Sequence, residues 1–172
     1  VRGAMGSVMD PPGAALLTDR YELAMLGAYL REGIAERRAV FELSVRRLPP
    51  HRRYLLVAGV DRAVRYLRDL RFGDNDIEYL RSAPGLADVM SDAMVSYLRE
   101  FRFRGDVDAV PEGEVAFESE PLLRIEGTLA DGQLLETFLL GVINAETRVA
   151  SKAARVVAAA EGRAVLEFGS RR

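Results

Sequence analysis

The segment that most limits what this chain can fold into is a long stretch in its last third with the pattern of one helix. Residues 130–161 contain no proline, and their apolar side chains recur at the spacing of a helix face. We therefore predict one long helix from Ala130 to Glu161, with Gly141 as the position where it could bend.

The two ends of the chain have unusual features. After the predicted helix, the apolar segment AVLEFGS at 164–170 predicts a final strand, and only Arg171 and Arg172 follow it. A last strand without a turn or a covering helix leaves backbone groups unpaired, so we expect a truncated chain. The letters GAMGS at 3–7 resemble the remnant of a removed tag, so we expect residues 1–13 to be a disordered arm or tag remnant.

Between these ends, several shorter segments have helical spacing. Thr18 or Asp19 can cap a helix that continues to about Glu32. Three more amphipathic helices are predicted, one before the Asp74 cap, one after it, and one after the Pro84-Gly85 break. The predicted apolar positions of the four helices are Leu23, Leu26 and Leu30; Val60, Val64 and Leu67; Ile77 and Leu80; and Val89, Met90, Ala93 and Leu98.

Residues 38–48 alternate strictly between apolar and polar side chains, which predicts a half-buried strand. Three later strand candidates are separated by turn residues, which predicts an antiparallel meander. They lie at 107–110, 114–118 and 121–127, and a further short extended piece is predicted at 54–58. The fold class is therefore α+β, with one domain over residues 14–128 and a helix-strand unit at 129–172 that opens a second α/β domain.

Composition excludes several classes of function. The chain has 24 Lys and Arg against 26 Asp and Glu, a net charge of -2, so we expect no nucleic-acid partner. It has no apolar run long enough to cross a membrane and no signal peptide, which predicts a soluble, cytoplasmic protein. Without cysteine and with His51 alone, the chain cannot form a thiolate or multi-histidine metal site.

Five sequence words carry more specific information. They are LLTDRYELAM at 16–25, FELSVRRLP at 41–49, RFRGDVDAVPEGEVAFESEPLLRIEG at 102–127, QLLETFLLGVINAETRVASKAARV at 133–156 and VLEFGSRR at 165–172. In this order and spacing they resemble the N-terminal part of a nicotinate phosphoribosyltransferase, from about Ala15 to Arg172. The resemblance implies an N-terminal α/β sandwich-like domain that leads into an irregular α/β barrel, of which residues 129–172 are the first helix and strand.

The resemblance also implies a reaction. Nicotinate is joined to the ribose of phosphoribosyl pyrophosphate, which gives nicotinate mononucleotide and pyrophosphate, with ATP hydrolysis driving the equilibrium. It further implies a homodimer with a shared active site. Mg²⁺ suits the dense negative charge of pyrophosphate, although no ligand for it is identifiable in the chain. A fragment of this length should be inactive alone.

The resemblance assigns substrate-binding roles to five residues. Tyr21, from the neighbouring subunit, and Phe168 flank the pyridine ring. Arg171 lies near the base and the phosphate, and Arg46 could reach a phosphate of the partner's substrate, because a guanidinium binds such anions through two parallel hydrogen bonds. Asp19 orients the ring-binding turn or contacts ribose. No residue of the chain is assigned a catalytic or metal-binding role.

Each of these residues also has a purely structural interpretation. Tyr21 and Phe168 could pack in the core, Asp19 could be a helix cap only, and Arg46 could lie on a solvated strand face. The family's phosphorylated histidine would lie beyond Arg172, so we interpret His51 as a surface loop residue. Two alternatives for the whole chain remain: a nicotinamide or quinolinate phosphoribosyltransferase, and a non-catalytic dimerisation or binding module.

Overall fold

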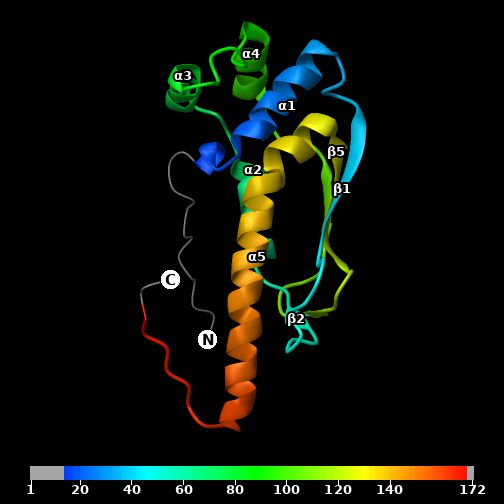
Figure 1. The fold of residues 1–172 in the computed structure, drawn as a ribbon, viewed down its shortest axis with the longest axis vertical. Coiled ribbons are helices and arrows are strands. Elements are labelled where there is room, and N and C mark those ends of the chain that lie inside the picture. Colours follow the sequence, from blue (N-terminus) through cyan, green and yellow to red (C-terminus); the bar gives the residue numbers. More distant parts are fainter. Residues whose placement is uncertain (1–13, 170–172) are drawn as a thin grey trace.

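The computed structural model describes residues 14–169 of the chain, which form an α+β fold (Figure 1). This confirms the predicted fold class. The elements follow in the order η1 (Ala14–Leu16), α1 (Arg20–Arg31), β1 (Arg38–Ser44), β2 (Leu55–Leu56), α2 (Val60–Asp69), α3 (Asp74–Ser82), α4 (Asp92–Glu100), β3 (Asp106–Ala109), β4 (Val115–Ala116), β5 (Pro121–Thr128) and α5 (Leu129–Ala160).

The long helix α5 is the central element of the fold. Thr128 caps it, since its hydroxyl accepts a hydrogen bond from the Asp131 N–H at 3.0 Å. The helix then runs for 32 residues and continues through Gly141 without a break. Helix α1, helix α2 and strands of both sheets pack on it (Figure 1). Its apolar side chains, including Leu134, Leu135 and Ile143, therefore form the middle of the core.

A three-stranded antiparallel sheet with the order β1-β5-β3 faces α5. Strand β1 pairs with β5 from Arg38 opposite Thr128 to Leu43 opposite Leu123. Its predicted alternation is confirmed, because Phe41, Leu43 and Val45 lie more deeply than the residues between them.

The predicted meander is wrong in one respect. Strand β3 pairs directly with β5, whereas β4 leaves this sheet and pairs with β2. Two turn contacts hold β4 there: the Val57 N–H donates to Glu114 O at 2.9 Å, and the Gly113 N–H donates to Val57 O at 2.8 Å. Because β2 and β4 are two residues each, neither carries a pattern from which its partner could be inferred.

Helix α5 also satisfies the outer edge of β2. The Thr147 hydroxyl accepts a hydrogen bond from the Ala58 N–H at 3.1 Å and donates one to Ala58 O at 3.0 Å. One turn further along, the Ser151 hydroxyl accepts from the Leu56 N–H at 2.9 Å. Two buried hydroxyls four residues apart on a helix thus replace a neighbouring strand.

Two predicted helix stripes are partly wrong. Helix α2 buries Ala63, Tyr66 and Leu67 and leaves Val64 exposed, because the Tyr66 ring stacks on Phe138 of α5 at a centroid distance of 3.5 Å. In α4 the buried residues are Met94, Val95 and Leu98, while Ala93 is exposed. The predicted cap of α3 is shifted by one residue, because Gly73 and not Asp74 is the N-cap of this helix.

The predicted final strand is absent from the described residues. Residues 163–169 have no strand pairing, and Phe168 is 94% exposed. An apolar alternating segment becomes a strand only when a neighbouring strand pairs with it, and no other strand of the described chain lies beside this one.

The glycines of α5 provide a test of this packing. A Cβ on Gly132 would overlap the Phe41 ring of β1, whereas a Cβ on Gly141 would meet no atom within 4 Å. We expect Gly132→Ala to lower the free energy of unfolding by about 1–3 kcal/mol through overpacking. Gly141→Ala should raise it by roughly 0.5–1 kcal/mol, because alanine favours the helix.

Urea unfolding of the 172-residue chain, followed by circular dichroism, measures both changes. Equal effects of the two substitutions would contradict the close approach of β1 to the start of α5.

Candidate functional site

The first turn of α1 meets the second turn of α5 through polar side chains. Two consecutive residues of α1, Tyr21 and Glu22, bind two consecutive residues of α5, Glu136 and Thr137. Asp19 is the N-cap of α1, as predicted, and its N–H donates to Glu22 Oε2 at 3.0 Å. This junction fixes the end of α1 that carries the TDRYE letters.

Glu22 is fully buried, and four donors surround its carboxylate. Oε1 accepts from the Thr137 hydroxyl at 2.7 Å and from the Thr137 N–H at 3.1 Å. Oε2 accepts from the Asp19 N–H and from the Thr18 hydroxyl. A buried carboxylate is tolerated only when hydrogen bonds replace its water, so this set of donors ties the two helices together.

Tyr21 lies at the surface of this junction and is 48% exposed. Its hydroxyl donates to Glu136 Oε1 at 3.1 Å. Partial desolvation, the hydrogen bond to Glu136 and the charges of Glu136, Glu22 and Asp19 raise the pKa of Tyr21 to about 12. The phenol therefore stays protonated at neutral pH, and about half of the side chain is accessible from solvent.

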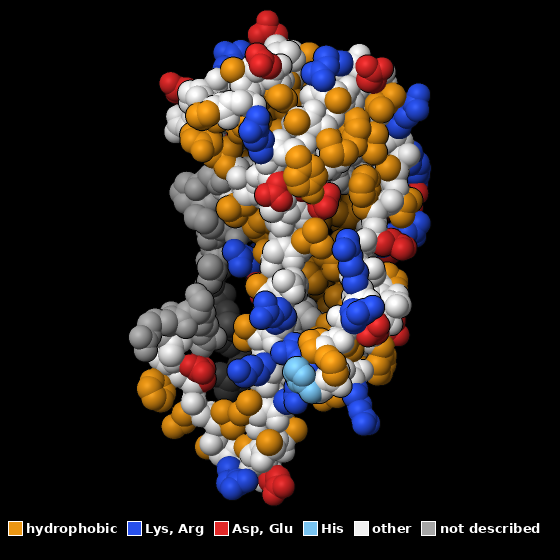
Figure 2. All heavy atoms as spheres, viewed as in Figure 1, with side chains coloured by type: hydrophobic (Ala, Val, Ile, Leu, Met, Phe, Trp, Pro, Cys, Tyr) orange, Lys and Arg blue, Asp and Glu red, His pale blue; other side chains and the backbone are white. Residues whose placement is uncertain are grey.

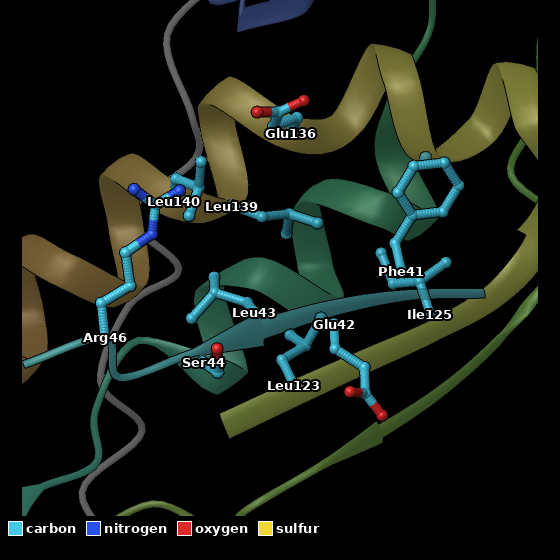
Figure 3. A pocket seen from close by; sticks show the side chains of 11 residues that line it. Phe41, Glu42, Leu43, Ser44, Arg46, Leu123, Ile125, Glu136, Leu139 and Leu140 are labelled. Atoms are coloured by element: carbon cyan, nitrogen blue, oxygen red, sulfur yellow. The ribbon is translucent and has the colours of Figure 1, made fainter. Parts of the chain in front are cut away.

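A cavity of about 320 Å³ lies between β1, β5 and α5, next to this junction (Figure 3). Phe41, Leu43 and Leu139 give it an apolar lining, while Glu42, Glu136 and Arg46 supply the charged groups. Figure 3 shows the Arg46 side chain extending beside Leu140 of α5. Glu136 thus links Tyr21 to the cavity that Arg46 also lines.

A second groove, of about 590 Å³, continues along α5 from Arg46. Four arginines line it: Arg46, Arg47, Arg52 and Arg148. Within residues 14–169, no carboxylate forms a salt bridge with any of them, and the buried Nε of Arg52 has no hydrogen-bond partner. Figure 2 shows basic side chains gathered on this face beside His51, which is exposed as predicted. Uncompensated guanidinium groups of this kind suit an anionic ligand.

The structure brings together three of the five predicted binding residues. Asp19, Tyr21 and Arg46 all lie near the Glu136–Leu140 turn of α5. Phe168 does not join them: it follows the far end of α5, and the helix rises about 36 Å between Glu136 and Ala160 at 1.5 Å per residue. Arg171 lies outside the described residues.

Sequence analysis missed Glu22, Glu136 and Thr137. A glutamate within a helix that otherwise buries leucines was one available signal, because Glu22 follows Tyr21 and precedes Leu23. No signal in the sequence pairs this residue with Thr137, which lies 115 positions away. The contact depends on how α1 packs against α5.

Comparison with known proteins first establishes the class of fold. The solved nicotinate-nucleotide pyrophosphorylase of Pyrococcus furiosus has the same fold over 96% of this chain and 35% of its own, with a TM-score of 0.67 at 24% identity. The solved human nicotinic acid phosphoribosyltransferase is closer, with a TM-score of 0.79 at 39% identity over 90% of this chain and 31% of its own.

The sequence comparisons define the family. Residues 16–144 match the model of the nicotinate phosphoribosyltransferase N-terminal domain. Nicotinate phosphoribosyltransferase pncB1 of Mycobacterium tuberculosis is 49% identical over 95% of the chain and 35% of its own length. The enzyme of Bacillus subtilis is 40% identical over 92% and 31%. The chain therefore belongs to the nicotinate phosphoribosyltransferase family and corresponds to its N-terminal domain, which confirms the resemblance. It spans about a third of the length of these relatives.

Two further features bear on cofactors and location. The described residues contain no cluster of three or more His, Asp and Glu side chains that could hold a metal ion. Among the helices of residues 14–169, none is both long and apolar enough to span a membrane.

The pKa of Tyr21 gives a test of the junction that does not depend on activity. Because carboxylate charge and the hydrogen bond from Tyr21 to Glu136 both raise it, Glu136→Gln should lower it toward the ordinary value of about 10. Partial desolvation remains, so the pKa should not fall fully to that value. NMR titration of the labelled Tyr21 ring carbon Cζ measures the change.

Glu146→Gln is the matched control, since Glu146 is on the same helix but pairs with Arg62.

The native Tyr21 holds its proton more tightly than the unfolded chain, so its contribution to stability is complete below pH 10 and is lost between pH 10 and about 12. An unchanged Tyr21 titration in Glu136→Gln would contradict the assigned hydrogen bond.

Proposed function

We propose that this chain is the N-terminal part of an enzyme that makes nicotinate mononucleotide from nicotinate and phosphoribosyl pyrophosphate, in NAD biosynthesis. The observation that carries this proposal is the family match over residues 16–144, together with relatives that bear the name nicotinate phosphoribosyltransferase. Those names favour nicotinate over nicotinamide or quinolinate as the base. Because the chain spans about a third of these relatives, we assign the activity to the complete protein.

Within this enzyme, Tyr21 would stack on the pyridine ring. Its half-exposed side chain, bound at the hydroxyl end by Glu136, supports this role, because an accessible aromatic ring can stack on a flat ligand. Arg46 would bind a phosphate, which its place in a groove of uncompensated arginines supports. Asp19 would act mainly by capping the helix that presents Tyr21.

Phe168 and Arg171 would complete the site from a second protomer. This assignment is supported by the length of α5, which places the start of the segment that carries Phe168 about 36 Å along the helix from Glu136, the partner of Tyr21. A homodimer in which each copy supplies Tyr21 to the other would resolve that separation. The first barrel strand, which would carry Phe168, would then form when further strands pair with residues 164–170.

Cofactor use and location extend the proposal. ATP would drive synthesis in the complete protein, and the protein would be cytoplasmic. The described residues offer no ligand set for Mg²⁺, so we derive no step through a metal ion.

Substitution of Tyr21 tests the proposed stacking. In the complete protein, Tyr21→Ala should raise KM for nicotinate by up to about tenfold, because a stacked aromatic pair contributes as much as about 1.5 kcal/mol. Tyr21→Phe keeps the ring and should stay within about threefold of the wild type. Steady-state formation of nicotinate mononucleotide measures both, with Tyr79→Ala as the control, since Tyr79 is an exposed tyrosine of α3. Wild-type kinetics in Tyr21→Ala would remove Tyr21 from the site.

Substitution of Arg46 tests the proposed phosphate contact. Arg46→Ala should raise KM for phosphoribosyl pyrophosphate by about tenfold or more and leave KM for nicotinate nearly unchanged, because a charged hydrogen bond contributes roughly 1.5–3 kcal/mol. Arg53→Ala is the matched control, since Arg53 is exposed and lines neither cavity. A rise in KM for both substrates alike would argue against a phosphate contact.

A further inference from the structure

We propose that Glu22 and Thr137 are positioning residues that hold Tyr21 in its binding orientation. The proposal rests on the proposed function, since it concerns the same ring. It assigns a role in substrate affinity to two side chains that do not touch the substrate. We call the contacts of Glu22 with Thr18, Asp19 and Thr137 the carboxylate clasp.

The first step of the argument is that packing alone cannot orient Tyr21. The residue lies in the first turn of α1, where backbone N–H groups lack partners within the helix and helix ends fray. With about half of its surface exposed, the ring is not enclosed by neighbours. The one hydrogen bond of its side chain among the described residues goes to Glu136.

The second step is that the carboxylate clasp fixes both partners of that hydrogen bond. Glu22 is the next residue after Tyr21, and Thr137 is the next residue after Glu136. The clasp therefore holds the backbone on both sides of the Tyr21–Glu136 contact. Thr137 binds the first turn of α1 twice over, because its hydroxyl also accepts from the Asp19 N–H at 3.2 Å while donating to Glu22.

The third step separates positioning from simple stability. Thr147 is a second threonine of α5 whose hydroxyl bonds to backbone groups. It is buried, and its partner is Ala58 beside β2, not α1. Loss of the Thr147 hydroxyl removes the partner of the Ala58 N–H and carbonyl, whereas loss of the Thr137 hydroxyl leaves Glu22 Oε1 bound to the Thr137 N–H. Thr147→Val should therefore destabilise the protein at least as much as Thr137→Val. Of the two changes, only loss of the Thr137 hydroxyl should free the Tyr21 ring to change its orientation.

The experiment compares threonine variants in the complete protein. Thr137→Val removes the hydroxyl and keeps the shape, and it should raise KM for nicotinate about three- to tenfold while kcat changes less. Thr137→Ser keeps the hydroxyl and should restore the wild-type KM. Thr147→Val should leave KM for nicotinate unchanged; because Thr147 also lines the arginine groove, the control is read on KM for nicotinate and not on KM for phosphoribosyl pyrophosphate.

A double-mutant cycle tests whether Thr137→Val raises KM for nicotinate through Tyr21. If Thr137 acts through Tyr21, Thr137→Val should raise KM no further in the Tyr21→Ala background. Additive effects, an unchanged KM in Thr137→Val, or an equal rise in Thr147→Val would each overturn the proposal.

A measurement without substrate separates this proposal from the proposed function. The NMR chemical shift of the labelled Tyr21 ring in the 172-residue chain should be the same in the wild type and in Thr137→Ser. In Thr137→Val the chemical shift should change, because it is averaged over several ring orientations. If the ring responds but Tyr21→Ala leaves KM unchanged, the stacking role fails while the orientation by the clasp stands. If the ring does not respond, the clasp does not position Tyr21, whatever the kinetics show.

Discussion

A buried carboxylate needs hydrogen-bond donors in place of water, and this requirement governs how the N-terminal helix sits in the molecule. Glu22 takes its donors from two places far apart in the chain, the turn that begins α1 and the second turn of α5. Removing either source would leave one oxygen of this buried carboxylate without its donors. Helix α1 can therefore adopt few positions on α5, and the tyrosine beside Glu22 is placed as a consequence of a stability constraint.

Helix α5 contacts three different parts of the fold along its length, and it must be long to reach all three. Near its start it binds α1 through Thr137, in its middle it covers the sheet with apolar side chains, and further on it closes the edge of β2 with Thr147 and Ser151. A rigid element of this length also keeps its two ends apart. Groups held at the two ends of the helix are therefore far apart in one chain, and the proposed homodimer would bring such groups together.

Much of this arrangement could be predicted from sequence, and the limits have a common cause. The boundaries of α1, the alternation of β1 and the extent of α5 follow from periodicity and capping, which are local properties. The pairing of β2 with β4, the burial of Ala63 in place of Val64, and the Glu22–Thr137 contact depend on residues distant in sequence. The candidate site divides in the same way. The sequence motifs proposed Tyr21 and Arg46, whereas the contacts of Glu22 and Glu136 with their partners are seen only once α1 is packed on α5.

Net charge gives an incomplete description of such a chain. A sum of -2 predicts no extended positive surface of the kind that a long polyanion such as nucleic acid needs. Yet the charges are unevenly placed: carboxylates of Glu22 and Glu136 gather where α1 meets α5, and arginines line the groove beyond Arg46. A small anion samples only its immediate surroundings, because screening in salt limits the reach of exposed charges to about 8–10 Å. For such a ligand the local arginine groove, rather than the sum over the chain, determines the attraction.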